Sequence, residues 1–130
     1  MFHVLLFTEF YEKVTALKSN NKKVLLALGG WNDSEGDKYS KMVNSPKHRK
    51  NFISTAVEFL VNNNFDGLDL DWEYPKCWQV DCSKGPDSDK KAFAELIKEL
   101  HFALKPKGDI FLTQNIFGII VIRFAVDCCC

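Results

Sequence analysis

Residues 65–75 read FDGLDLDWEYP, an apolar run with an acid at every second position toward its end. Because side chains alternate between the two faces of a β-strand, we expect Asp69, Asp71 and Glu73 on one face and the intervening apolar residues on the other. Same-face neighbours lie ~6.6 Å apart along a strand, so these carboxylates repel one another and the pKa of at least one should be raised. A carboxyl that keeps its proton at neutral pH can act as a general acid.

An active site is one interpretation of the acidic strand, and two less specific interpretations are also open. It could be an edge strand whose acids lie in water, or its carboxylates could bind magnesium or calcium, although no other ligand is identifiable. The surrounding pattern favours an active site, because strands of α/β proteins are usually covered on both faces. The acids also lie toward the C-terminal end of the strand, where the active sites of such folds collect.

The segments before the acidic strand alternate between helix and strand patterns. Residues 24–28 form a continuous apolar run closed by two glycines, as expected of a strand buried on both faces. Apolar spacing predicts a helix over residues 9–19 with Thr8 as its N-cap. A second helix should begin at Ser45-Pro46 and end at the asparagines 62–64. The polar residues 32–41, between the strand at 24–28 and this second helix, are expected to form a loop with solvated acids.

The segments after the acidic strand continue the alternation. The strand itself is expected over residues 65–72, and a loop rich in Cys, Gly and Pro leads to an amphipathic helix with its apolar face between Phe93 and Leu104. Residues 110–113 begin a third strand. The order α-β-α-β-α-β predicts an α/β fold with a parallel sheet and right-handed crossovers.

Composition narrows the functional classes. The chain has 130 residues, 17 basic and 17 acidic, and a formal net charge of +0. This balance gives no electrostatic footprint for nucleic acid or an anionic membrane. The apolar stretch over residues 110–126 is interrupted by polar side chains and too short to span a membrane. Residues 2–7 do not make a convincing signal peptide.

The cysteines leave two interpretations open. A bridge between Cys77 and Cys82 closes a short ring and implies an oxidising compartment, whereas two free thiols in a polar loop fit the spacing equally well. The adjacent cysteines 128–130 have no histidine nearby to complete a zinc site. We therefore predict neither a metal nor a cofactor.

Two motifs carry a resemblance to a known family. Asp66-x-x-Asp69-x-Asp71-x-Glu73 resembles the DxxDxDxE signature of family-18 glycoside hydrolases, the chitinases, and residues 23–31, KVLLALGGW, resemble the family's other signature on the preceding strand. Residues 11–108, roughly three-quarters of the chain, are most similar to insect chitinases. The resemblance implies chitin or a chitooligosaccharide as substrate, without cofactor or obligate protein partner.

The resemblance also implies a role for each acid. Glu73 would protonate the glycosidic oxygen, and Asp71 would orient the N-acetyl group of the substrate, whose carbonyl oxygen attacks to form an oxazolinium ion with overall retention of configuration. Asp69 would sit behind Asp71 and share a proton with it, which would tune the pKa values of both. Asp66 would be a more distant, structural member of the motif.

Aromatic residues and glycines near the motifs are candidate substrate contacts. Trp31 could stack on a sugar, with a place in the core as the alternative, and Tyr74 and Trp78 are weaker candidates for the same role. Gly30, beside Gly29, is a candidate contact for which a structural role is favoured, because small residues allow close approach of backbone segments.

The family fold is a (β/α)8 TIM barrel, which needs about 200 residues or more, so the resemblance implies a partial barrel. We expect this chain to cover about the third to the start of the fifth strand. Residues 9–113 would be the partial catalytic barrel, with a divergent N-terminal end at 1–8 and a divergent tail at 114–130.

We expect a truncated chitinase with impaired activity, since a partial barrel leaves sheet edges unpaired. The alternatives are a non-catalytic chitin-binding or growth-factor-like relative, against which the intact Glu73 argues, and a truncated product without function. An extracellular location is inferred from the family, since the chain shows no leader of its own.

Overall fold

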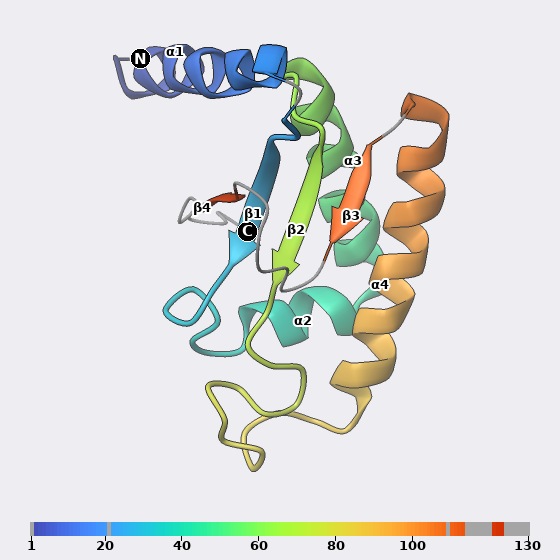
Figure 1. Ribbon diagram of the computed structural model, residues 1–130. Helices are drawn as coiled ribbons and strands as arrows, with labels where there is room; N and C mark the ends of the chain where they lie inside the picture. The colour runs from blue at the N-terminus through green and yellow to red at the C-terminus, as the bar shows by residue number, and fades with distance from the viewer. Residues whose placement is uncertain (1, 21, 109, 114–120, 124–130) are drawn as a thin grey trace.

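A parallel sheet forms the centre of the molecule (Figure 1). The structure is a computed structural model that describes residues 2–20, 22–108, 110–113 and 121–123, with side chains over 9–18, 22–108 and 110–113. Within these residues the strand order is β3-β2-β1-β4. The strands are β1 (Leu25–Gly29), β2 (Gly67–Asp71), β3 (Phe111–Thr113) and β4 (Val121–Arg123). All pairings are parallel, which confirms the predicted α/β class.

The two signature segments are neighbours in this sheet. β1 pairs with β2 from Leu25 opposite Gly67 to Gly29 opposite Asp71, so the two strands end at the same level. β3 pairs with the other edge of β2, and β4 pairs with the outer edge of β1. Part of the tail at 114–130 is therefore a strand, whereas residues 114–120 and 124–130, which include the cysteines 128–130, lie outside the described residues.

The first helix begins earlier than predicted. α1 spans Phe2–Thr15 and continues as the 3-10 helix η1 (Ala16–Asn20), whereas apolar spacing predicted a start near residue 9. Residues 2–7 contain no glycine or proline that would stop a helix from extending toward the N-terminus. Thr8 therefore lies inside the helix and is not its N-cap.

The predicted loop over residues 32–41 is partly helical. α2 spans Lys38–Asn44 and buries Tyr39 and Val43, which lie one turn apart on the same face. Such a short helix has too few turns to show a clear periodicity in the sequence. The tertiary packing of these two side chains selects it.

The helix predicted to begin at Ser45-Pro46 begins and ends as predicted. α3 spans Pro46–Asn62; the Oγ of Ser45 accepts a hydrogen bond from the backbone N–H of His48 at 3.3 Å, and Pro46 occupies the first turn. Asn64 takes a φ of 58°, the left-handed conformation that Asn tolerates after a helix.

The main apolar core includes the face of the sheet that α3 and α4 cover. α4 spans Ser88–Leu104 and leads into the 3-10 helix η2 (Lys105–Lys107). Figure 1 shows α3 and α4 beside the sheet and α2 below the strand ends. The fully buried leucines of this core are Leu60, Leu68, Leu96 and Leu100. No helix among the described residues is long and apolar enough to cross a membrane.

Candidate active site

The acids of the motif lie at the carboxyl end of a central strand. β2 has β1 on one side and β3 on the other, so the edge-strand interpretation is wrong. Asp69 and Asp71 are each only 1% exposed, whereas Glu73, two residues beyond the strand, is half-buried. The intervening Leu70 and Trp72 lie in the apolar core. The strand thus separates acids from apolar side chains, as the alternation predicted.

Asp69 retains unused hydrogen-bonding capacity. Its Oδ1 accepts a hydrogen bond from the Oγ1 of Thr113 on β3 at 2.9 Å. Its Oδ2 is buried and has no hydrogen-bond partner among the described residues. Burying a polar oxygen without a partner is unfavourable, and such groups are rare in folded proteins. Thr113 was not a candidate from the sequence; its register opposite Asp69 brings it to the site.

Glu73 is held through its backbone. Its N–H donates to the Oγ of Ser34 at 2.8 Å, and its carbonyl accepts from the N–H of Gln79 at 3.0 Å; the Glu73–Tyr74 peptide is cis. Within the described part of the chain its carboxyl makes no hydrogen bond or ion pair. A half-buried carboxyl on a fixed backbone, without a partner among the described residues, can reach a group on a bound substrate.

Asp66 lies at the opposite end of the strand. Its Oδ2 accepts from the N–H of Val24 at 2.7 Å, and its Oδ1 forms ion pairs with Lys18 at 3.3 Å and Lys23 at 3.7 Å. These contacts tie the start of β2 to the segment before β1. The structure therefore does not bring Asp66 together with the other three acids.

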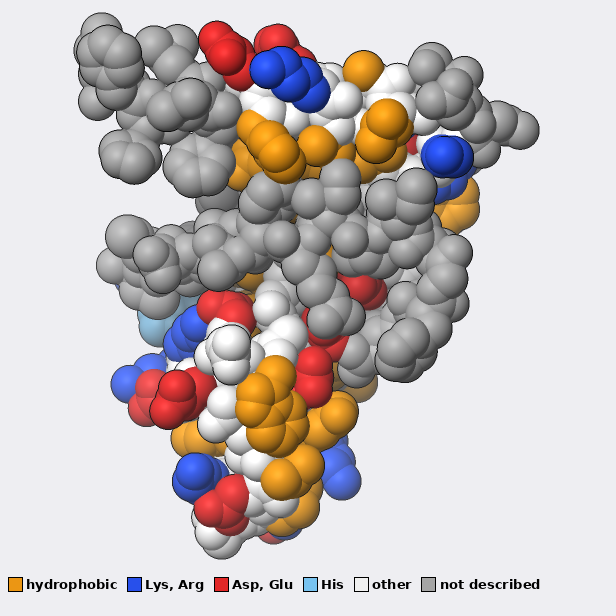
Figure 2. All heavy atoms as spheres, turned by 60° about the vertical axis from the view of Figure 1, so that its left-hand side comes forward, with side chains coloured by type: hydrophobic (Ala, Val, Ile, Leu, Met, Phe, Trp, Pro, Cys, Tyr) orange, Lys and Arg blue, Asp and Glu red, His pale blue; other side chains and the backbone are white. Residues whose placement is uncertain are grey.

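The aromatic candidates differ in exposure. Trp31 is 47% exposed and Tyr74 is 41% exposed, so the core interpretation of Trp31 is wrong. Figure 2 shows apolar side chains beside acidic ones on the lower part of one face of the molecule. The carbonyl of Trp31 accepts a hydrogen bond from the Nε2 of Gln79 at 3.0 Å. Trp78 instead packs against the core, and its indole is engaged by Asp89.

The two glycines after β1 allow a close backbone approach. Gly29 has a φ of 112°, and a Cβ at this position would lie 2.3 Å from the carbonyl oxygen of Asp71. Gly30 has a φ of 92°, and its N–H donates to the same carbonyl at 2.7 Å. These contacts place β1 and the acidic strand end against each other.

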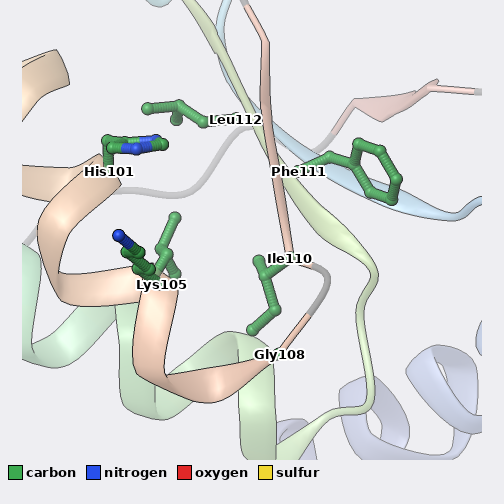
Figure 3. A pocket seen from close by; sticks show the side chains of 7 residues that line it. His101, Lys105, Gly108, Ile110, Phe111 and Leu112 are labelled. Carbon is green, nitrogen blue, oxygen red and sulfur yellow. The ribbon is translucent and has the colours of Figure 1, made fainter.

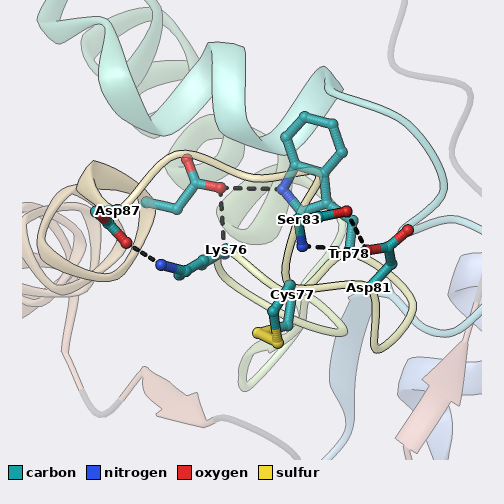
Figure 4. The surroundings of a disulfide bond; sticks show 8 residues. Lys76, Cys77, Trp78, Asp81, Ser83 and Asp87 are labelled. Carbon is teal, nitrogen blue, oxygen red and sulfur yellow. Dashed lines mark hydrogen bonds and ion pairs between the residues drawn. A yellow bond between two sulfur atoms is a disulfide. The ribbon is translucent and has the colours of Figure 1, made fainter.

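A disulfide-closed loop follows Glu73 (Figure 4). Cys77 and Cys82 are joined by a disulfide, so the free-thiol interpretation does not hold. The loop is fixed by the fully buried Asp89 on α4, which accepts hydrogen bonds from the backbone N–H of Lys76 at 3.2 Å and the Nε1 of Trp78 at 3.0 Å. Nothing in its sequence neighbourhood marked Asp89 as different from a surface acid.

The acids do not line the hollow in Figure 3. That hollow, about 410 Å³, lies between the end of α4 and β3 and is lined by residues such as His101, Lys105 and Phe111. Over the described ranges, no group of three or more His, Cys, Asp and Glu side chains is arranged to hold a metal ion.

Comparisons with known proteins agree on one family. The model of "Glycosyl hydrolases family 18" matches residues 4–122. "Probable chitinase 10" of Drosophila melanogaster is 52% identical over 100 residues, which are 77% of this chain and 4% of that protein. The crystal structure of Ostrinia furnacalis Group II chitinase catalytic domain 2 is 58% identical with a TM-score of 0.81, over 88% of this chain and 30% of that one.

A second structure of that domain contains a ligand. It is a mutant in complex with penta-N-acetylchitooctaose, (NAG)5; it is 61% identical with a TM-score of 0.79, and the match covers 82% of this chain and 27% of that one. The chain thus spans less than a third of each of these proteins.

Proposed function

The chain belongs to glycosyl hydrolases family 18, and we propose that it carries the acid-bearing part of an active site that hydrolyses the β-1,4-N-acetylglucosamine linkages of chitin. The observation that carries this proposal is the set of three carboxylates, Asp69, Asp71 and Glu73, at the end of a central strand. The two inner acids are buried and the outermost is half-buried. The Ostrinia furnacalis complex with (NAG)5 supports a chitooligosaccharide as substrate.

The proposed mechanism retains the anomeric configuration and uses the substrate as nucleophile. Glu73 donates its proton to the glycosidic oxygen as the bond to the leaving sugar breaks. The N-acetyl carbonyl oxygen of the substrate attacks the anomeric carbon, and Asp71 orients that group and stabilises the oxazolinium ion. The Glu73 carboxylate then takes a proton from the water that attacks the anomeric carbon and opens the oxazolinium ring. Asp69, behind Asp71, would share its proton.

The surrounding residues fit this assignment. The exposed rings of Trp31 and Tyr74 would contact sugar faces, and Gly30 would lie close enough to the site to contact substrate. Asp66 would be structural, since its partners are backbone and lysine groups at the far end of the strand. The disulfide between Cys77 and Cys82 supports an extracellular location.

The strands β1, β2 and the short β3 would be the third, fourth and start of the fifth strand of a (β/α)8 barrel. Residues 9–113 would form this partial barrel between divergent ends. An eight-stranded sheet can close on itself, whereas the described sheet keeps an open edge at β3. We therefore expect this chain alone to hydrolyse chitin poorly.

The test compares this chain with a version completed by the remaining barrel strands of the Ostrinia furnacalis domain. Release of shorter sugars from (NAG)5 is followed by chromatography. Glu73→Gln should lower kcat by about 10²–10⁴ in the completed barrel, the usual contribution of a general acid. The exposed acid Glu35 provides the control Glu35→Gln, which should leave kcat unchanged.

Two results would contradict the assignment. Hydrolysis that survives Glu73→Gln would remove Glu73 from the mechanism. Sugar binding without hydrolysis in the completed barrel, unaffected by Glu73→Gln, would instead identify a non-catalytic chitin-binding relative.

A further inference from the structure

The backbone of Glu73 lies beyond the hydrogen-bond ladder of the sheet. β1 and β2 both end at the Gly29–Asp71 pair, so Glu73, two residues later, has no strand partner for its N–H among the described residues. A backbone N–H that is left without a partner in a half-buried position costs stability and lets the peptide rotate. A side chain from the turn after β1 takes the place of the missing ladder.

That side chain is Ser34. It is fully buried, and its Oγ accepts from the N–H of Glu73 at 2.8 Å while lying 3.4 Å from the carbonyl oxygen of Asp71, to which it donates. A hydroxyl has one donor and two acceptor positions, so it can make both contacts at once. Ser34 therefore bridges the backbone on both sides of Trp72.

The turn that carries Ser34 is itself fixed. The N–H of Ser34 donates to the carbonyl of Gly30 at 2.9 Å, and the N–H of Gly30 donates to the carbonyl of Asp71 at 2.7 Å. On the other side, the carbonyl of Glu73 accepts from Gln79. Both peptide groups of Glu73 are thus held, and the hold on its N–H comes from a side chain that a substitution can remove.

We propose that Ser34 is a positioning residue for the acid, holding the peptide between Trp72 and Glu73 so that the Glu73 carboxyl keeps its place relative to Asp71. This inference rests on the proposed role of Glu73. Because only one residue separates Glu73 from Asp71, a rotation of that peptide changes the distance between the two carboxyls. Misplacement of a catalytic group by about 1 Å can cost about 10²-fold in rate.

The first measurement uses the full chain and needs no turnover. In Ser34→Ala, hydrogen exchange of the Glu73 amide should accelerate about tenfold, the loss expected for one hydrogen bond, while the amides of Leu68 and Leu70 in β2 stay as protected as before. Ser34→Thr, which keeps the hydroxyl, should restore protection. Ser54→Ala removes an exposed hydroxyl that donates to the carbonyl of Asn51 and serves as the control.

The second measurement is kinetic and uses the completed barrel. Ser34→Ala should lower kcat for (NAG)5 about tenfold with KM within a factor of two, because sugar contacts remain while the acid is displaced. Ser34→Thr should recover most of kcat. A purely structural serine would leave kcat unchanged in the folded protein.

The outcomes separate this inference from the proposed function. If the Glu73 amide stays protected in Ser34→Ala, or if kcat is unchanged, Ser34 does not position the acid. If the completed barrel shows no Glu73-dependent hydrolysis, the proposed function fails, and the exchange measurement still decides whether Ser34 holds residue 73.

Discussion

Replacing Asp89 should destabilise the fold more than replacing any exposed acid. The carboxylate is fully buried, and its four hydrogen-bond donors come from two regions of the chain. Oδ1 accepts from the Oγ of Ser40 at 2.6 Å and the Nδ2 of Asn44 at 2.7 Å, both on α2. Oδ2 accepts from the N–H of Lys76 and the indole of Trp78 in the disulfide loop.

The expected magnitude follows from these four bonds. A hydrogen bond to a charged group contributes ~1.5–3 kcal/mol, but truncation to alanine also removes the cost of burying the carboxylate. Without the carboxylate these four neutral donors lose their acceptor, and a buried donor left without a partner costs ~1–3 kcal/mol. Trp78 and Lys76 are half-buried, so water can replace part of what they lose. We expect Asp89→Ala to lower the free energy of unfolding by about 3–4 kcal/mol.

The assay is urea unfolding of the oxidised chain, followed by circular dichroism and tryptophan fluorescence. Asp87→Ala is the matched control, because Asp87 lies two residues earlier, is 88% exposed and pairs only with Lys76 among the described residues. Asp89→Asn keeps one acceptor but turns an amide toward N–H donors, so its effect should be intermediate. A loss below about 1 kcal/mol in Asp89→Ala, or equal losses in Asp87→Ala and Asp89→Ala, would refute the reasoning.

Two further substitutions test the packing beside the site and the acid sensitivity of the fold. Gly29→Ala should lower Tm much more than Gly36→Ala, because both positions have positive φ but only a Cβ at Gly29 would collide with the carbonyl of Asp71; equal shifts would show that this contact does not matter. The hydrogen bond from Arg49 lowers the pKa of Glu99 below its usual 4.5, so this pair stabilises the fold above that pH and the contribution is lost as pH falls through the folded-state pKa. Glu99→Gln should therefore flatten the dependence of Tm on pH between about 5 and 3, and an unchanged slope would contradict this assignment.

Local patterns predicted much of the fold. The apolar run at residues 24–28 and the alternation over 65–72 indicated two strands within one or two residues of their observed bounds. Ser45-Pro46 identified the start of α3 because the cap and the first turn are formed by neighbouring residues. α2 was missed, since its seven residues show little periodicity before Tyr39 and Val43 meet the core.

The covalent spacing in residues 66–73 determined which acids share a face, because side-chain alternation is a property of the strand itself. Sequence could not decide whether Trp31 is exposed, which acid is buried as an anchor, or what holds the backbone of Glu73. Asp89 lies 49 residues from Ser40, and Ser34 lies 39 residues from Glu73. A hydrogen bond between such distant residues depends on how helices and strands pack, so only the tertiary structure decided it.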